Sequence, residues 1–183
     1  MRSGANDALL RVLRGSKRTA ALWTEFRALR DIRDRSPSPE PVRVAETVTD
    51  AWESLSTDGG ALSTVEDGLV YADPAWFDHL FTALLQNAVD HVGPDVTVRV
   101  GILDGRDGFY VADDGPGIAP EHRETVFERG YTTADDGTGF GLRIARHVVD
   151  EHGWDLSLAD AADGGARFEV RTGDVGVLRS DGA

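Results

Sequence analysis

This chain of 183 residues has no cysteine, and Lys17 is its only lysine. Without cysteine it can form no disulfide, no thiolate metal site and no thiol nucleophile. No run approaches the roughly 18 apolar residues that cross a bilayer, and no apolar signal segment opens the sequence. We therefore expect a cytoplasmic protein with one domain, a packed core and a small appendage.

Basic residues are scarce relative to acidic ones, and the net charge is −13. Phosphate contacts along a nucleic acid need a basic patch, so this balance argues against a nucleic-acid-binding protein. Aspartate outnumbers glutamate, and arginine almost entirely replaces lysine. The plain explanation is a solvated acidic surface that keeps the protein soluble. A sharper explanation, which we favour, is adaptation to high salt, where screening weakens the repulsion between dense carboxylates.

The pattern of apolar residues divides the chain into four parts. Residues 1–35 predict a helical arm, because leucines and aromatic residues recur at spacings of three and four, and the arm could be the remnant of a dimerisation hairpin. That apolar repeat is too short to establish a coiled coil, so a homodimer through the arm stays open. Residues 36–41 are a proline-rich connector. The main domain is expected over residues 42–173, and a tail over 174–183.

Within the main domain, helical and strand patterns alternate. In chain order they predict a helix over 42–55, strands over 61–65 and 69–71 joined by a hairpin turn, a helix from Asp73-Pro74 to Val92, strands over 96–103 and 108–112, a short helix after Pro120, a loop over 129–140, a helix over 141–152, and strands over 154–158 and 166–171. We expect a mixed sheet with helices on one face, an α+β two-layer sandwich.

Asn87 lies in an apolar helical stretch, between Leu84-Leu85 and Ala88-Val89. An exposed helical asparagine is the ordinary interpretation. Its apolar neighbours instead favour a polar group at the edge of a core. An amide oxygen there can bind a Mg²⁺ ion that also bridges phosphate oxygens, because this ion prefers oxygen ligands and keeps several waters.

Asp113 ends a strand and precedes Gly115-Pro116-Gly117-Ile118. Such a carboxylate can accept a hydrogen bond from the amino group of adenine, while the glycines allow close backbone approach. An acidic β-turn is the alternative, since Asp-Gly pairs are common in turns.

Gly137-Thr138-Gly139-Phe140-Gly141-Leu142 leads from a polar loop into a helix. Backbone N–H groups in such a loop, together with the positive end of the helix, can bind phosphate groups. The spacing and late position differ from those of a dinucleotide-binding turn, and no lysine follows as in a P-loop. A flexible loop with a helix cap is the alternative.

Taken together, residues 41–172 resemble the ATP-binding domain of sensor histidine kinases, a Bergerat-type fold shared with gyrase, the Hsp90 chaperones and MutL. The matching pieces stand in the family's order: Leu84–His91, Asp113–Ile118, Val126–Tyr131, Gly137–Leu142 and Gly164–Phe168.

The resemblance implies ATP under a mobile lid at residues 129–140, Asn87 on Mg²⁺ and Asp113 on adenine. It also implies His91 and Arg129 near the phosphates. The full set of implied nucleotide-binding residues is Asn87, His91, Asp113, Gly115, Gly117, Ile118, Arg129, Tyr131, Thr132, Gly137, Thr138, Gly139, Phe140, Gly141 and Leu142. Implied partners are a histidine-bearing helical hairpin and a response regulator.

Two features depart from that family pattern. A polar or acidic residue commonly stands four positions before the asparagine, and here it is Ala83. Alanine cannot activate water, which disfavours gyrase-type hydrolysis, whereas an imidazole is already a competent nucleophile. In addition, no histidine precedes His79, so the acceptor histidine of the family's hairpin is missing from this sequence.

Three functions therefore stay open. The favoured one is a kinase domain that phosphorylates a histidine located elsewhere. The others are a nucleotide-binding interaction module without phosphotransfer and a relative of the anti-sigma serine kinases. Histidines 79, 122, 147 and 152 are interpreted as surface or helix-end residues, and the four tryptophans as packing residues.

Overall fold

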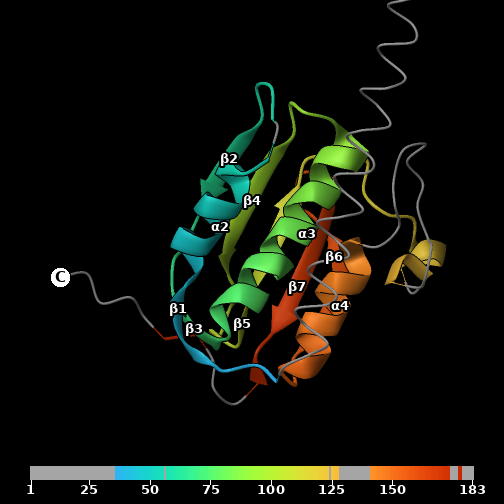
Figure 1. Cartoon of the computed structure of the whole chain (residues 1–183). Coiled ribbons are helices and arrows are strands. Elements are labelled where there is room, and N and C mark those ends of the chain that lie inside the picture. The colour runs from blue at the N-terminus through green and yellow to red at the C-terminus, as the bar shows by residue number, and fades with distance from the viewer. Residues whose placement is uncertain (1–35, 56, 124, 128–140, 174–176, 179–183) are drawn as a thin grey trace, which may run out of the picture.

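The computed structural model describes residues 36–55, 57–123, 125–127, 141–173 and 177–178. It confirms the predicted class, because a mixed sheet is covered on one face by helices (Figure 1). The elements are β1 (Glu40–Arg43), α2 (Val44–Glu53), β2 (Ala61–Thr64), β3 (Leu69–Ala72), α3 (Pro74–Val92), β4 (Thr97–Ile102), β5 (Gly108–Asp113), the 3-10 turns η1 (Pro120–His122) and η2 (Thr125–Phe127), α4 (Gly141–Glu151), β6 (Asp155–Asp160) and β7 (Ala166–Arg171). The predicted arm, residues 1–35, lies outside the described residues. Within the described residues, none of the helices is long and apolar enough to span a membrane.

The predicted hairpin between residues 61–65 and 69–71 is wrong. β2 pairs in parallel with β4, whereas β3 pairs with β1 in a separate two-stranded sheet. The main sheet runs in the order β2-β4-β5-β7-β6, with antiparallel pairing from β4 onward. The chain bends at residues 65–66 without forming a hairpin, and Asp67 serves another purpose: its Oδ1 accepts the N–H of Ala45 at 2.9 Å and so holds the start of α2.

The second correction concerns the start of the main domain, where a connector and then a helix were predicted. Residues Glu40–Arg43 form a strand instead, and α2 begins only at Val44. Proline is tolerated in this strand because β1 is an edge strand, where one side of the backbone faces no partner strand. The tail also contributes to this small sheet, since Leu69 and Leu178 form a β-bridge with two 2.9 Å hydrogen bonds.

Helix α3 is the central element of the core and begins where the sequence predicted. The Oδ1 atom of Asp73 accepts the N–H groups of Ala75 at 3.1 Å and Trp76 at 3.3 Å, which caps the helix. The apolar face of α3 is fully buried against the sheet, with Phe77 and Phe81 packed edge-on and both close to Phe109 of β5. α3 therefore presents its remaining residues from a fixed position.

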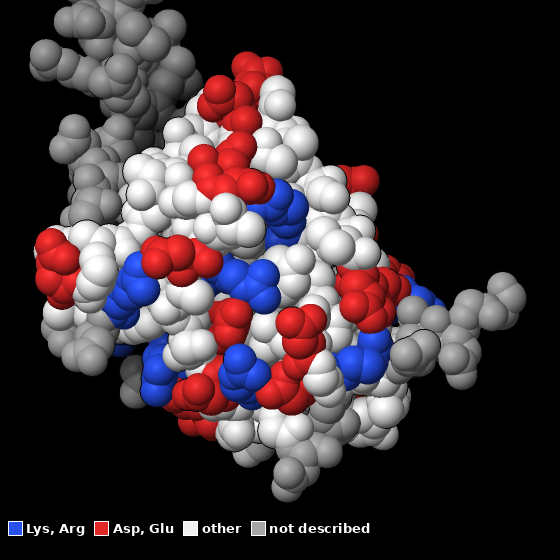
Figure 2. All heavy atoms as spheres, turned by 180° about the vertical axis from the view of Figure 1, so that it is seen from behind, with Lys and Arg blue, Asp and Glu red and all other residues white. Residues whose placement is uncertain are grey.

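The opposite face of the sheet carries charged side chains of both signs. Figure 2, which shows the molecule from behind the view of Figure 1, displays acidic and basic residues intermingled across this surface. Ion pairs here include Arg167 with Glu169 at 2.8 Å, and Arg171 with Asp107 at 2.6 Å. Among the described residues, charges of both signs therefore alternate on this side without a continuous basic patch.

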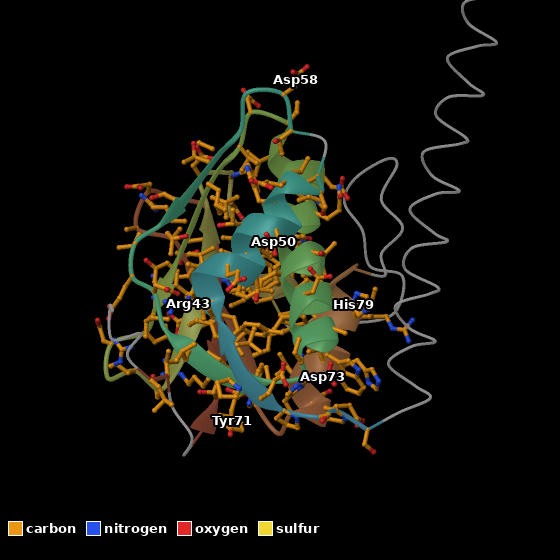
Figure 3. All side chains as sticks on the ribbon, turned by 60° about the vertical axis from the view of Figure 1, so that its left-hand side comes forward. Arg43, Asp50, Asp58, Tyr71, Asp73 and His79 are labelled. Carbon is orange, nitrogen blue, oxygen red and sulfur yellow. The ribbon has the colours of Figure 1, made fainter. Side chains whose placement is uncertain are left out.

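His152, just beyond α4, connects the end of that helix to the start of α3. Its Nε2 accepts the backbone N–H of Asp73 at 3.1 Å, and its Nδ1 lies 2.8 Å from the carbonyl oxygen of Val148. Only the neutral ring can accept at Nε2 while donating from Nδ1. The second carboxylate oxygen of Asp73, the residue labelled in Figure 3, accepts the N–H of Ser38 at 2.9 Å, so the connector is bound to the same point.

Burial lowers the pKa of His152, against the opposing effects of the Val148 carbonyl and the carboxylates of Asp73 and Glu151. The unfolded chain therefore binds a proton below about pH 6.5 that the folded chain excludes, and stability falls as the pH drops through that window. We expect His152→Gln to flatten the decline of the unfolding free energy between pH 7.5 and 5.5, measured by urea titration. If His152→Gln loses stability with falling pH as steeply as the parent does, the pH dependence does not come from His152.

Candidate nucleotide-binding site

Asp113, the last residue of β5, is held in one orientation by backbone donors. Its side chain is buried, and Oδ1 accepts the N–H of Gly115 at 2.9 Å and of Ala166 at 3.1 Å. Among the described residues no partner is found for Oδ2. A carboxylate with one oxygen fixed in this way can direct the other toward a donor such as an exocyclic amino group.

Glycines make this arrangement of Asp113 possible. A Cβ at Gly165 would lie 1.9 Å from the Asp113 carbonyl oxygen and 2.6 Å from Oδ1, so no other residue fits without displacement of β5 or the β6–β7 turn. Gly117 has a φ of +74° and approaches the Gly164 carbonyl, where a Cβ would lie at 3.0 Å. The Asp113 turn and the β6–β7 turn therefore pack backbone against backbone.

Asn87 lies half-buried on the flank of α3 that faces α4. Successive helical residues are about 100° apart, which places Trp76 and Ala83 on this same flank. Trp76 contacts the rings of His147 and His152 near the far end of α4, at centroid distances of 6.2 and 5.7 Å. Helices α3 and α4 are therefore antiparallel neighbours along this flank.

Two other backbone segments reach α3 on either side of Asn87. A Cβ on Gly141, the first residue of α4, would lie 3.7 Å from the carbonyl oxygen of Ala83, one turn before Asn87. A Cβ on Gly115 would lie 2.3 Å from Cγ2 of Val92, more than one turn after it. The two contacts are about 13 Å apart along the helix axis. The start of α4 and the turn after β5 thus contact α3 before and after Asn87, on different sides of the helix.

The remaining predicted site residues divide into two groups. Ile118 and Leu142 are partly buried and pack against the core, and His91 is exposed on α3 one turn after Asn87. Arg129, Tyr131, Thr132, Gly137, Thr138, Gly139 and Phe140, with the predicted lid over residues 129–140, lie outside the described residues.

The sequence did not identify two contributors to the site. Ala166 supplies a backbone N–H to Asp113, and no residue type marks such a donor in a sequence. Gly165 was part of a motif that matched the family, but only its contact with Asp113 explains why glycine is needed there. Asp114, next to Asp113, points elsewhere: its Oδ1 accepts the N–H of Thr97 at 2.9 Å, and this bond lowers the pKa of Asp114.

Comparison with known proteins identifies the family of this chain. The family described as "Histidine kinase-, DNA gyrase B-, and HSP90-like ATPase" matches residues 72–174, so the chain belongs to that family. More narrowly, it contains the catalytic, ATP-binding domain of the sensor histidine kinases of two-component signalling. It is 35% identical over 125 residues to the sensor histidine kinase YkoH of Bacillus subtilis, an alignment that covers 64% of this chain and 27% of that protein.

Solved structures give the same result. The mycobacterial sensor histidine kinase MprB superposes with a TM-score of 0.62 at 29% identity, covering 73% of this chain and 95% of that structure. Full-length ShkA in complex with AMPPNP superposes with a TM-score of 0.70 over 97% of this chain and 40% of that one, at 21% identity, which supports the fold alone. The chain spans only 25% to 30% of the length of the curated relatives that it matches first.

Proposed function

We propose that this chain binds ATP between α3, the Asp113 turn and the start of α4, and that it transfers the γ-phosphate to a histidine carried by another segment or chain. The observation that supports this most strongly is the fixed Asp113 carboxylate, whose Oδ1 is occupied by two backbone donors. Its Oδ2 would accept a hydrogen bond from the amino group of adenine. Ile118 would contact the base, while His91, Arg129 and the glycine segment Gly137–Leu142 would lie near the phosphates.

Asn87 would bind Mg²⁺ through its amide oxygen. Among the described residues, no group of three or more histidine, aspartate or glutamate side chains could form a metal cage. A single amide oxygen fits an ion that is held mainly by phosphate oxygens and water, which is the usual arrangement for Mg²⁺ with nucleotides. When bound, the ion would neutralise the charge that develops on the phosphates.

The test of transfer uses γ-labelled ATP, this chain and a separate helical hairpin that bears a histidine. We expect label on the hairpin that is stable in alkali and lost in acid. A hairpin with glutamine in place of that histidine is the control and should stay unlabelled. ATP binding without label on the histidine-bearing hairpins of several sensor histidine kinases would contradict the proposed transfer.

A second candidate is an ATP-binding interaction module without phosphotransfer, and Ala83 favours it. This residue is buried at the contact between α3 and the start of α4, one turn before Asn87, and carries no group that could activate a water or a hydroxyl. The labelling experiment separates the two candidates, since the module would bind ATP and label nothing.

We further propose that a response regulator receives the phosphate from the histidine, and that this takes place in the cytoplasm. The chain would comprise an arm over residues 1–35, through which it could form a homodimer, a connector over 36–41 whose last two residues begin β1, the ATP-binding domain over 42–173 and a tail over 174–183. The bond between Ser38 and Asp73 supports a connector that is fixed to the domain.

We also propose that the acidic surface adapts the protein to high salt. At a net charge of −13 the carboxylates repel one another, and the screening length falls from about 10 Å at 0.1 M salt to about 3 Å at 1 M. Raising KCl from 0.1 to 2 M should increase the melting temperature by roughly 5 °C, a gain of about 1–2 kcal/mol at this size. A variant with asparagine at the exposed Asp50, Asp58 and Asp104 (the first two labelled in Figure 3) should show a smaller rise in melting temperature over the same KCl range. A melting temperature independent of KCl would contradict this proposal.

A further inference from the structure

We propose that Arg123 is a positioning residue for the base-binding side of the pocket, an inference that rests on the proposed ATP site. Arg123 follows the short turn η1, and its guanidinium makes two contacts. Its Nε donates to the carbonyl oxygen of Ile118 at 3.2 Å, and its NH2 group forms an ion pair with Asp160. One side chain thus connects the turn after Asp113 to the edge strand β6.

The partner of Arg123 places this contact next to the site. Asp160 is the last residue of β6 and stands opposite Ala166 in the β6–β7 register. Ala166 is the residue whose N–H holds Asp113. A closed ring of contacts therefore runs from Asp113 through Ala166 and Asp160 to Arg123, then through Ile118 back along the chain to Asp113.

The stretch that Arg123 holds has little regular structure of its own. Its backbone hydrogen bonds from His122 to Ala119 at 2.9 Å, and from Arg123 to Pro120 at 3.3 Å, are both local and do not bind the turn to the sheet. Further along the chain, in η2, Val126 is buried and the ring of Phe127 meets Phe168 of β7 edge-on at 6.4 Å, which forms a second anchor. Arg123 thus connects the turn to β6 between Ile118 and this second anchor.

The chemistry of arginine suits this task. The planar guanidinium offers donors in a fixed fork, so it can donate to a carbonyl and a carboxylate at once in one geometry. A lysine ammonium at the same place has the charge without the fork. Loss of Arg123 would remove the side-chain bond to the Ile118 carbonyl, leaving core packing alone to hold Ile118 where it would meet the base, while Asn87 and the start of α4 keep their positions.

The test compares Arg123→Ala and Arg123→Lys with Arg171→Ala, measuring dissociation constants for ATP, ADP and AMP by calorimetry. Arg171 is a matched control, because it is also paired with a carboxylate, Asp107, but lies at the other end of β7. We expect Arg123→Ala to weaken all three nucleotides by a similar factor, about tenfold, which corresponds to roughly 1.4 kcal/mol. Arg123→Lys should recover little, and Arg171→Ala should bind like the parent.

The outcomes separate this inference from the proposed function. A parent chain that binds no ATP would overturn both. If the parent binds ATP and Arg123→Ala binds it equally well, only the role of Arg123 is overturned. A loss seen only with ATP and not with AMP would also overturn that role, because it would assign Arg123 to the phosphates. If Arg123→Ala lowers the melting temperature markedly, Asp160→Asn replaces it in the same measurement, because it removes only the ion pair. Weaker binding of all three nucleotides by Asp160→Asn supports the inference, and binding like that of the parent overturns it.

Discussion

Asp113→Asn is expected to weaken ATP binding by more than a hundredfold while leaving the fold intact. The amide is isosteric with the carboxylate, and its oxygen can keep the hydrogen bonds from Gly115 and Ala166. Its NH2 group would then face the adenine amino group, so that an acceptor is replaced by a second donor. Loss of a charged acceptor together with an unpaired buried donor costs about 3 kcal/mol, roughly a hundredfold or more in affinity.

The neighbouring carboxylate supplies the control for this measurement. Asp114→Asn removes the same charge one residue later, but Asp114 is exposed and bonded to Thr97, away from the pocket. It should bind ATP like the parent. The discrimination between ATP and GTP should also narrow in Asp113→Asn, because guanine presents an acceptor where adenine presents an amino group. Equal affinities of Asp113→Asn and the parent for ATP would show that the base lies elsewhere.

Asn87→Ala is expected to produce the second-largest loss, and only in the presence of magnesium. Removing one oxygen ligand from an ion that bridges the protein and the phosphates costs on the order of 2 kcal/mol, roughly thirtyfold in affinity. In EDTA the variant and the parent should bind ATP alike, because no ion then connects Asn87 to the nucleotide. Calorimetry in both buffers measures the difference.

Gln86→Ala is the matched control for Asn87. It removes the adjacent amide from the same helix, but Gln86 donates to Asp90 at 2.7 Å, one turn along α3 on a different side. Its affinity for ATP should match that of the parent in both buffers. An Asn87→Ala variant whose loss is the same with and without magnesium would contradict the assignment of Asn87 to the metal, and would place its amide on the nucleotide itself.

Local chemistry determined which parts of the fold could be predicted. The start of α3 was predictable because Asp73 and Pro74 act within one turn of the helix, and the cap is present. The pairing of β2 and β3 was not, because the partner of β2 is β4, which is distant in sequence, and a turn signal between two strands does not specify which strands pair. The strand at Pro41 was missed for a similar reason, since its partner β3 makes a strand favourable where the prolines alone indicated a connector.

The candidate site also has parts that local sequence indicates and parts that only the folded chain brings together. Asn87 could be predicted as a candidate because it is a polar residue in an apolar helical stretch, and Asp113 because it ends a strand just before Gly115-Pro116-Gly117. Gly165 and Ala166 act through backbone atoms and became visible only in three dimensions, as did the ion pair between Arg123 and Asp160. His152 was interpreted as a helix-end residue, and it is one, but its bond to the Asp73 N–H could not be inferred from sequence.

The central claim is that Asn87, the Asp113 turn and the start of α4 surround one adenine nucleotide. The most direct measurement is a calorimetric titration of this chain with ATP in magnesium. The account predicts a saturable heat of binding with one site per chain, and competition by ADP. Absence of any heat of binding up to millimolar ATP, with the protein shown to be folded by circular dichroism, would contradict it.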